Sequence, residues 1–243
     1  CYGRERAGCG AERLYGHCDG PRDHIEAGKV AEVRALLKEI DWDCKIMTLF
    51  RDENKGLRQG VSNAISWFFE QEEMGIVLED DCLPDPSFFP FCESLLERYR
   101  NEPKVMHITG SNLAEQLSTD NIESYFFSKF TFVWGWASWR RAWEKMSLNL
   151  DGFDQFVSEK KIATLTGDPM AQAYMLDKFE ATKGNRNNSW AYAWFYSILN
   201  AGGLAIVPGK NLVQNTGIGA SDATHTNRKD EKAAIAASKS ISR

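Results

Sequence analysis

Apolar residues in the first half of the chain follow two alternating spacings, one typical of buried strands and the other of amphipathic helices. Short apolar runs predict strands over residues 13–18, 44–50, 76–78 and 105–109. Apolar residues at helical spacing predict helices over residues 25–40, 57–70 and 88–100. This alternation predicts an α/β domain whose mostly parallel sheet is flanked by helices and joined by right-handed crossovers.

The alternation breaks after about residue 112. Residues 125–133 have the pattern of a strand or an extended loop, and residues 204–207 predict a last short strand. Helices are expected over residues 137–146, 153–165, 170–182 and 190–201. Residues 228–243 are charged and then rich in Ala, Ser and Lys, which is typical of a surface helix or a disordered tail.

The start of the chain is short for a domain of this kind. Only about a dozen residues, rich in glycine and charge, precede the first predicted strand. A parallel α/β domain that binds nucleotides normally opens with a strand and helix of its own. We therefore expect the first strand–helix unit to be missing or abbreviated.

Three consecutive acids, Glu79, Asp80 and Asp81, follow the apolar run at residues 76–78, and Pro84 comes soon after them. Ligands bind outside the carboxyl ends of strands in open α/β sheets. Three adjacent carboxylates repel one another unless a positive charge lies among them, and a hard divalent cation prefers oxygen ligands. The sequence predicts either a metal site or an acidic turn after a strand, and the acids alone do not decide between them.

Composition narrows the classes of function. The hydrophobic content of 43% and charged content of 26% are ordinary for a globular protein, and a net charge of -5 argues against a nucleic-acid or anionic-membrane surface. No apolar run approaches the length of a transmembrane helix. None of the six cysteines has C-x-x-C or zinc-finger spacing, which favours free thiols in a reducing compartment.

Several motifs together resemble the GT-A fold nucleotide-diphospho-sugar glycosyltransferases. Within that group the chain is most similar to bacterial sugar transferases distantly similar to N-acetylglucosaminyltransferase I. The motifs are DGPR at residues 19–22, EDDCLPDPSFF at 79–89, GWASWRRAW at 135–143, NLVQNTGIG at 211–219 and ATHT at 223–226. The resemblance covers residues 13–227. It implies one domain over residues 1–227, with a nucleotide-binding half at about 13–112 and an acceptor half at about 113–227, followed by the tail at 228–243.

The resemblance implies a metal site built on the acidic triplet. In these enzymes a D-x-D-type motif holds Mn²⁺ or Mg²⁺ on the diphosphate of the donor, here with a UDP-sugar favoured. Asp81 is the expected direct ligand, Glu79 a further ligand and Asp80 a contact to the donor. His225 lies where a late histidine completes the coordination in this family, and the alternative is an exposed loop histidine.

The resemblance also implies where the nucleotide lies. Asp19 matches the position that contacts the base or ribose, although Asp-Gly-Pro is also a good turn. Arg51, Asn54 and Lys55 follow the second predicted strand. Either Arg51 or Lys55 could bind phosphate, and solvated surface charge is an equal alternative.

Tryptophans are unusually frequent, with eight in the chain. The resemblance places Gly135, Trp136 and Trp190 at the wall that faces the acceptor and the donor sugar. Aromatic rings can stack on the apolar face of a sugar, but core packing is the commoner role. We expect at least one of Trp134, Trp136 and Trp139 to face a pocket.

The catalytic base is the point where the chain departs from the family. The family tends to carry an acid at the position of Ala191, and an inverting transferase needs a carboxylate to accept the proton of the acceptor hydroxyl. Asp222, Asp85 and Glu79 are weaker candidates for this role.

Two functions therefore stay open. The first is an enzyme that moves a sugar from a nucleotide-diphospho-sugar to a glycan or lipid-linked acceptor, in the cytoplasm or at the inner membrane surface. The second is a catalytically silent relative that binds a nucleotide or a sugar.

Overall fold

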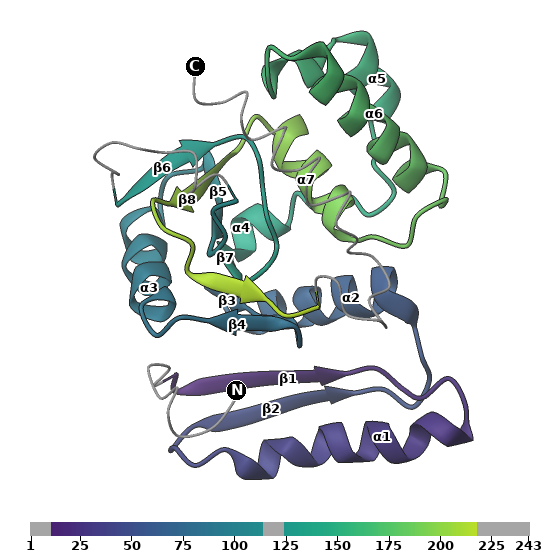
Figure 1. Ribbon diagram of the computed structural model, residues 1–243, viewed down its shortest axis with the longest axis vertical. Helices are drawn as coiled ribbons and strands as arrows, with labels where there is room; N and C mark the ends of the chain where they lie inside the picture. Colours follow the sequence, from purple (N-terminus) through teal and green to yellow (C-terminus); the bar gives the residue numbers. More distant parts are fainter. Residues whose placement is uncertain (1–10, 114–123, 218–243) are drawn as a thin grey trace.

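The computed structural model describes residues 11–113 and 124–217, which form a small N-terminal unit and a larger body connected through helix α2 (Gly56–Gln71) (Figure 1). The N-terminal unit consists of β1 (Arg13–Cys18), α1 (His24–Ala35), a 3-10 turn at Leu36–Glu39 and β2 (Lys45–Phe50). Strands β1 and β2 pair in parallel in a sheet of their own, with Arg13 opposite Lys45 and Cys18 opposite Phe50. The predicted strand, helix and strand are confirmed here.

The larger body is built on a mixed sheet of five strands in the order β3-β7-β5-β8-β6. Their bounds are Met74–Val77 (β3), Val105–Thr109 (β5), Tyr125–Ser128 (β6), Trp136–Trp139 (β7) and Leu204–Pro208 (β8). Only β5 and β8 pair in parallel, and the other three pairs are antiparallel. Strands β3, β5 and β8 therefore run one way while β7 and β6 run the other, so the α/β class is confirmed and the mostly parallel sheet is wrong.

Strand β7 forms two of the three antiparallel pairs. We expected residues 137–146 to be helical, but Trp136–Trp139 form a strand between β3 and β5, and only Arg140–Trp143 form a short helix, α4. All four residues of β7 are buried, and alternate side chains enter the cores on opposite faces of the sheet. The two-sided burial of a central strand overrides the helical pattern of the motif.

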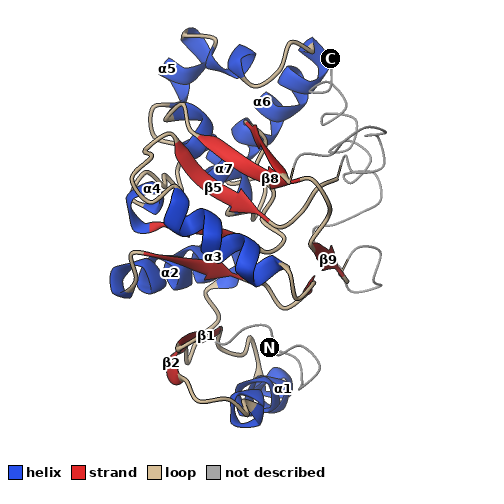
Figure 2. Ribbon diagram, turned by 90° about the vertical axis from the view of Figure 1, so that its left-hand side faces the viewer, coloured by secondary structure: helices blue, strands red, loops and turns tan. Residues whose placement is uncertain are grey.

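Helices cover both faces of this sheet (Figure 2). Helix α3 (Phe88–Arg98) packs on one face, against β3 and β7. Residues of α2, α4 and α7 (Ala191–Asn200) form the core on the other face. A third core joins α7 to α5 (Phe153–Ser158), a 3-10 turn at Lys161–Thr164 and α6 (Pro169–Lys183).

A short antiparallel ladder joins two motifs that are far apart in the sequence. Strand β4 (Cys82–Pro84) pairs with β9 (Val213–Asn215), and neither strand was predicted. Val213 packs so closely that an added Cβ would lie 2.5 Å from it at Gly110 and 2.7 Å from it at Gly135. Gly135 also has a φ of +63°, which favours glycine. Close packing against Val213 and the positive φ therefore explain why residue 135 is a glycine.

Two further predictions concern the described residues. No helix within residues 11–113 and 124–217 is long and apolar enough to cross a membrane. Cys18, Cys44, Cys82 and Cys92 are free thiols, and the remaining two cysteines lie outside the described residues.

Candidate active site

The acidic triplet lies in the turn that follows β3. Burial first, then the charges of Asp81 and Asp80, raise the pKa of Glu79 to about 7, against a hydrogen bond from the indole of Trp190 that lowers it. Asp80 is exposed. The triplet therefore presents an enclosed carboxyl group at Glu79 and a solvated one at Asp80.

Asp81 is held by the late NLVQNTG motif. Asn215 Nδ2 donates to Asp81 Oδ2 at 3.1 Å, while the backbone N–H and the hydroxyl of Thr216 donate to the Asp81 carbonyl at 2.8 and 3.1 Å. A Cβ on Gly217 would lie 2.8 Å from Asp81 Oδ2. The structure thus brings the acidic triplet and the NLVQNTG motif into contact. His225 and Asp222 lie outside the described residues.

The donor set can be compared with the proposed metal. Asp81 and Glu79 provide carboxylate oxygens, the ligand type that Mg²⁺ and Mn²⁺ prefer. No group of three His, Cys, Asp or Glu side chains suited to a metal occurs in the described part of the chain. Mg²⁺ usually binds one or two carboxylates together with substrate phosphates, and the two acids fit that pattern.

Asp19 follows β1 and caps the start of α2. Its two carboxylate oxygens accept the backbone N–H of Lys55 at 2.8 and 3.0 Å, and Oδ2 also accepts that of Gly56 at 3.0 Å. A Cβ on Gly60 would lie 3.1 Å from the same Oδ2. A carboxylate is favourable at a helix N-terminus, where amide groups lack partners within the helix. The cap explains Asp19, and its contact to a nucleotide stays a prediction.

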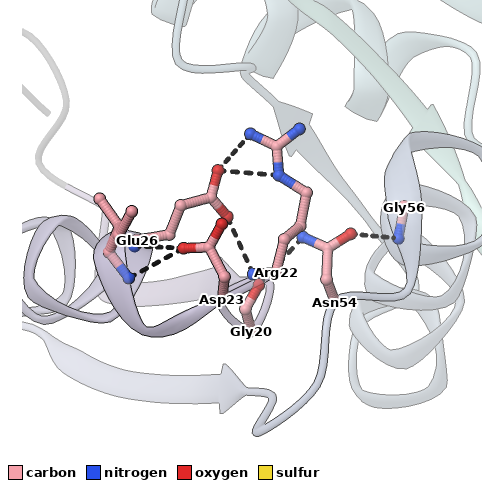
Figure 3. A network of polar contacts seen from close by, with 7 residues as sticks. Gly20, Arg22, Asp23, Glu26, Asn54 and Gly56 are labelled. Atoms are coloured by element: carbon pink, nitrogen blue, oxygen red, sulfur yellow. Dashed lines mark hydrogen bonds and ion pairs between the residues drawn. The ribbon is translucent and has the colours of Figure 1, made fainter.

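Asn54 joins the loops that follow β1 and β2 (Figure 3). Its Nδ2 donates to the Gly20 carbonyl at 2.9 Å, and its Oδ1 accepts the Gly56 N–H at 3.0 Å. The ammonium group of Lys55 pairs with Glu53 at 2.9 Å in solvent. Asp19, Asn54 and Lys55 therefore meet at one helix terminus, although the Lys55 side chain is directed to a surface ion pair.

Arg51 lines a hollow between α1 and β2, and Arg34 connects it to Asp19 by donating to the backbone carbonyls of both residues. The hollow has a volume of about 570 Å³ and is lined by apolar residues of α1, by Phe50 and by the cations Arg34, Lys38 and Arg51. Arg34 lies over the Phe50 ring at 4.9 Å, and the Nε atoms of Arg34 and Arg51 have no hydrogen-bond partner among the described residues. Sequence reasoning missed Arg34, because its place on a helix gives no signal of this hollow.

The tryptophans of the expected sugar wall lie in the core. Trp136 has 0% and Trp190 has 2% of its surface exposed. The Trp136 ring stacks on His107 at 5.1 Å and lies 5.9 Å from Trp190. Trp139 is also buried, so neither tryptophan of β7 faces a pocket, whereas Trp134 is half-buried and is the remaining candidate of the three. Of the proposed wall, only Trp190 reaches the site, through its hydrogen bond to Glu79.

The start of α7 connects the triplet to Asp19. Trp190 is the N-cap of α7 and Ala191 its first residue. The Asn188 side chain lies 3.9 Å from the position of a Cβ on Gly56, whose N–H binds Asp19. Contacts therefore run from Asp19 through the N-termini of α2 and α7 to Glu79.

Asp85 fits a structural role better than a catalytic one. It is exposed, and its Oδ1 accepts the Ser87 hydroxyl at 2.5 Å and the Ser87 N–H at 2.9 Å, which lowers the pKa of Asp85. Strand β4 separates Asp85 from Asp81, and four residue steps of about 3.3 Å place their Cα atoms roughly 13 Å apart. A carboxylate of lowered pKa is a weak acceptor of protons.

Comparison with known proteins does not add to this geometry. The chain matches no model of a protein family and no curated protein sequence.

Proposed function

We propose that this protein is a metal-dependent glycosyltransferase of GT-A type that transfers a sugar from a nucleotide-diphospho-sugar, with a UDP-sugar favoured, to a glycan or lipid-linked acceptor. The observation that carries the proposal is the fastening of Asp81, at the carboxyl end of β3, by Asn215 and Thr216 of the late motif. The Asn215 side chain, 134 residues further along the chain, holds the carboxylate of Asp81, and Thr216 holds its backbone carbonyl. A turn whose only role is to end a strand does not need this support.

In this proposal a bound Mn²⁺ or Mg²⁺ offsets the charge of the donor diphosphate and stabilises it as a leaving group. Asp81 and Glu79 would hold the cation from the protein side, with His225 as the candidate third ligand. Asn215 orients Asp81 and Trp190 orients Glu79. The N-terminus of α7, which has no side-chain cap, would add backbone N–H groups and a positive dipole near the phosphates.

Within the described residues, Glu79 is the alternative to Asp85 as the base, a role that would exclude Glu79 from the metal and leave Asp81 as the described ligand. Glu79 is enclosed and hydrogen-bonded beside Ala191, the position where the family carries an acid, whereas Asp85 is exposed and engaged in capping α3. Asp222 remains a candidate from outside the described residues. A carboxylate in this position would accept the proton of the attacking hydroxyl.

Thermal denaturation with Mn²⁺, UDP and both together tests the metal and nucleotide parts of the proposal. We expect Mn²⁺ and UDP together to raise Tm, by about 2–4 °C for each kcal/mol of binding. Asp81→Asn should abolish this rise, while Asp177→Asn, an exposed acid on α6, should keep it. A rise of equal size in the Asp81 variant would refute the metal assignment.

The alternative is a silent binding relative, and Ala191 is the observation that favours it. Ala191→Asp restores an acid at the first position of α7, where a carboxylate also suits the helix dipole. If the base is missing, this variant should raise donor turnover by roughly a hundredfold or more without changing UDP affinity. If the unmodified chain already transfers sugar to a panel of acceptors, the silent alternative is wrong.

A further inference from the structure

Helix α1 lies at the outer end of the N-terminal unit, where β1 and β2 separate it from the larger body (Figure 1). Large apolar side chains gather on its solvent side: Ile25, Val33 and Leu36 are 70%, 53% and 53% exposed. Leu36 is the C-cap of α1, and its φ of −58° and ψ of −24° continue the helical backbone. Apolar side chains that gather on one exposed face indicate a contact surface.

Four exposed residues form a stripe along this face, and we call them the α1 seam: Ile25, Lys29, Glu32 and Leu36. They are separated by four, three and four residues, which is the spacing of a coiled-coil seam. On a helix with about 3.6 residues per turn, the four side chains lie within roughly 60° of one another. The stripe is therefore suited to pack along a second helix.

The α1 seam has the same pattern when it is read backwards. In both directions an apolar residue comes first, two charged residues follow and an apolar residue ends the stripe. In an antiparallel pair centred between Val30 and Ala31, Ile25 of one copy lies level with Leu36 of the other, and Lys29 lies level with Glu32. A two-fold axis repeats each of these contacts, so the surface is complementary to itself.

The two charges at the centre of the seam have no partner inside the described chain. No hydrogen bond or ion pair within residues 11–113 and 124–217 involves the side chain of Lys29 or that of Glu32. Glu26, one turn before Lys29, is already engaged, because Arg22 Nε donates to it at 2.8 Å. The central cation and anion are therefore available to a second copy.

Gly28 lies beside the seam, within α1. A Cβ on Gly28 would meet nothing within 4 Å, and Gly28 does not have a positive φ. Glycine inside a helix is destabilising relative to alanine, so neither the backbone of α1 nor its packing within one copy explains this residue. The close approach of a second helix does, since a glycine lets two backbones come near each other.

We propose that the α1 seam packs antiparallel on the α1 seam of a second copy of this chain, about a two-fold axis, to form a homodimer. One helix pair buries less surface than the roughly 1,600 Å² of a standard interface, so this dimer is weak and forms at high concentration. It removes Ile25 and Leu36 from water in the region of the molecule that buries no apolar side chain of its own.

Sedimentation of the full chain from about 5 to about 500 µM measures this association. The unmodified chain should shift from monomer to dimer within that range. Lys29→Glu makes all the central charges negative and Glu32→Lys makes them all positive, so each should weaken the dimer about tenfold or more. Lys38→Glu is the matched control, because Lys38 is exposed and lines the hollow on another side of the same segment. The control should dimerise like the unmodified chain.

A mixture of the two seam variants tests the register of the pair. When Lys29→Glu meets Glu32→Lys, each central contact again joins opposite charges, so the mixture should dimerise although neither variant does so alone. Circular dichroism of each variant alone should match that of the unmodified chain, since both positions are exposed. A chain that stays monomeric throughout the range overturns the proposal, and so does a mixture that associates no better than its components. A dimer that neither variant weakens uses another surface and equally overturns it.

Discussion

The N-terminal unit and the body that follows it both combine strands and helices, but they differ greatly in how many apolar side chains they bury. The body, residues 56–217, contains three hydrophobic cores with fully buried residues such as Trp136, Trp194 and Ile206. Residues 11–55 form regular strands and a well-capped helix but bury no apolar side chain. Regular hydrogen bonding and caps therefore suffice to define elements, while packing decides which of them are stable.

The contrast matters for function because the proposed site takes residues from both regions. Asp81, Glu79 and Trp190 belong to the packed body, whereas Asp19 comes from the N-terminal unit. The two are connected by the cap on α2 and by Tyr15. The predicted nucleotide contacts thus depend on how firmly the less packed region is docked.

The largest effect is expected in the body. Trp194→Ala removes a fully buried ring beside Trp136 and Trp143 and leaves the Nδ1 atom of His107 without its indole donor. We expect unfolding free energy to fall by about 3–5 kcal/mol in urea denaturation. The comparison is Leu37→Ala in the N-terminal unit, where a methyl group of Leu37 lies 3.2 Å from the position of a Cβ on Gly16. This variant should lower the unfolding free energy by far less. Equal losses would contradict the contrast between the regions.

The next effect is a loss of stability in acid that originates in the body. Burial lowers the pKa of His107 to about 4, while the hydrogen bond to the Phe132 carbonyl opposes that shift. The folded state therefore prefers neutral His107, and stability falls as pH decreases from about 6.5 through about 4. The loss should reach about 3 kcal/mol at the low end.

Denaturation in urea between pH 7 and pH 4 measures this term, with His107→Gln as the control that removes the titrating group. The control should be less stable at pH 7 and should lose less on acidification. If both proteins show the same slope with pH, carboxylates rather than His107 cause the acid sensitivity.

Sequence patterns predicted the elements with local causes and missed those with distant ones. The strand at residues 105–109 and the helix that starts near Phe88 follow from short-range apolar spacing, and the structure has them. Strand β7 was read as a helix because its strand geometry comes from β3 and β5 on either side. The β4–β9 ladder pairs residues more than a hundred positions apart, so local pattern carries no signal of it.

The candidate site shows the same division. The position of the acids after β3 could be predicted from the apolar run before them. The cap formed by Asp19 on Lys55 and Gly56 could not, since the partners are 36 and 37 residues away and are backbone groups. The burial of Trp136 was likewise hidden, because a tryptophan in a motif looks the same whether it lines a pocket or fills a core.

A smaller effect is expected where the two regions meet at Asp19. Asp19→Ala removes the acceptor for two N–H groups of α2 and should lower stability by about 0.5–2 kcal/mol, with faster amide exchange at the start of α2. Asp19→Asn keeps an acceptor oxygen and should retain most of the stability. If Asp19→Asn loses UDP binding while α2 stays protected, the carboxylate has a nucleotide role beyond the cap.

The smallest effect concerns the other connection between the regions. Tyr15→Phe removes the hydroxyl that donates to Glu72 at 2.6 Å but keeps the ring that packs against Trp67 and Phe68. A typical hydrogen bond contributes about 0.5–1.5 kcal/mol net, and this partly exposed one should lie at the low end. Because the bond joins β1 to the residue before β3, its loss should speed amide exchange in β1 and β2 and leave β5 and β8 unchanged. Hydrogen exchange resolved by peptide measures this difference directly. If amide exchange becomes equally faster in β5 and β8, the N-terminal unit unfolds together with the body. The division into two regions would then describe packing and not stability.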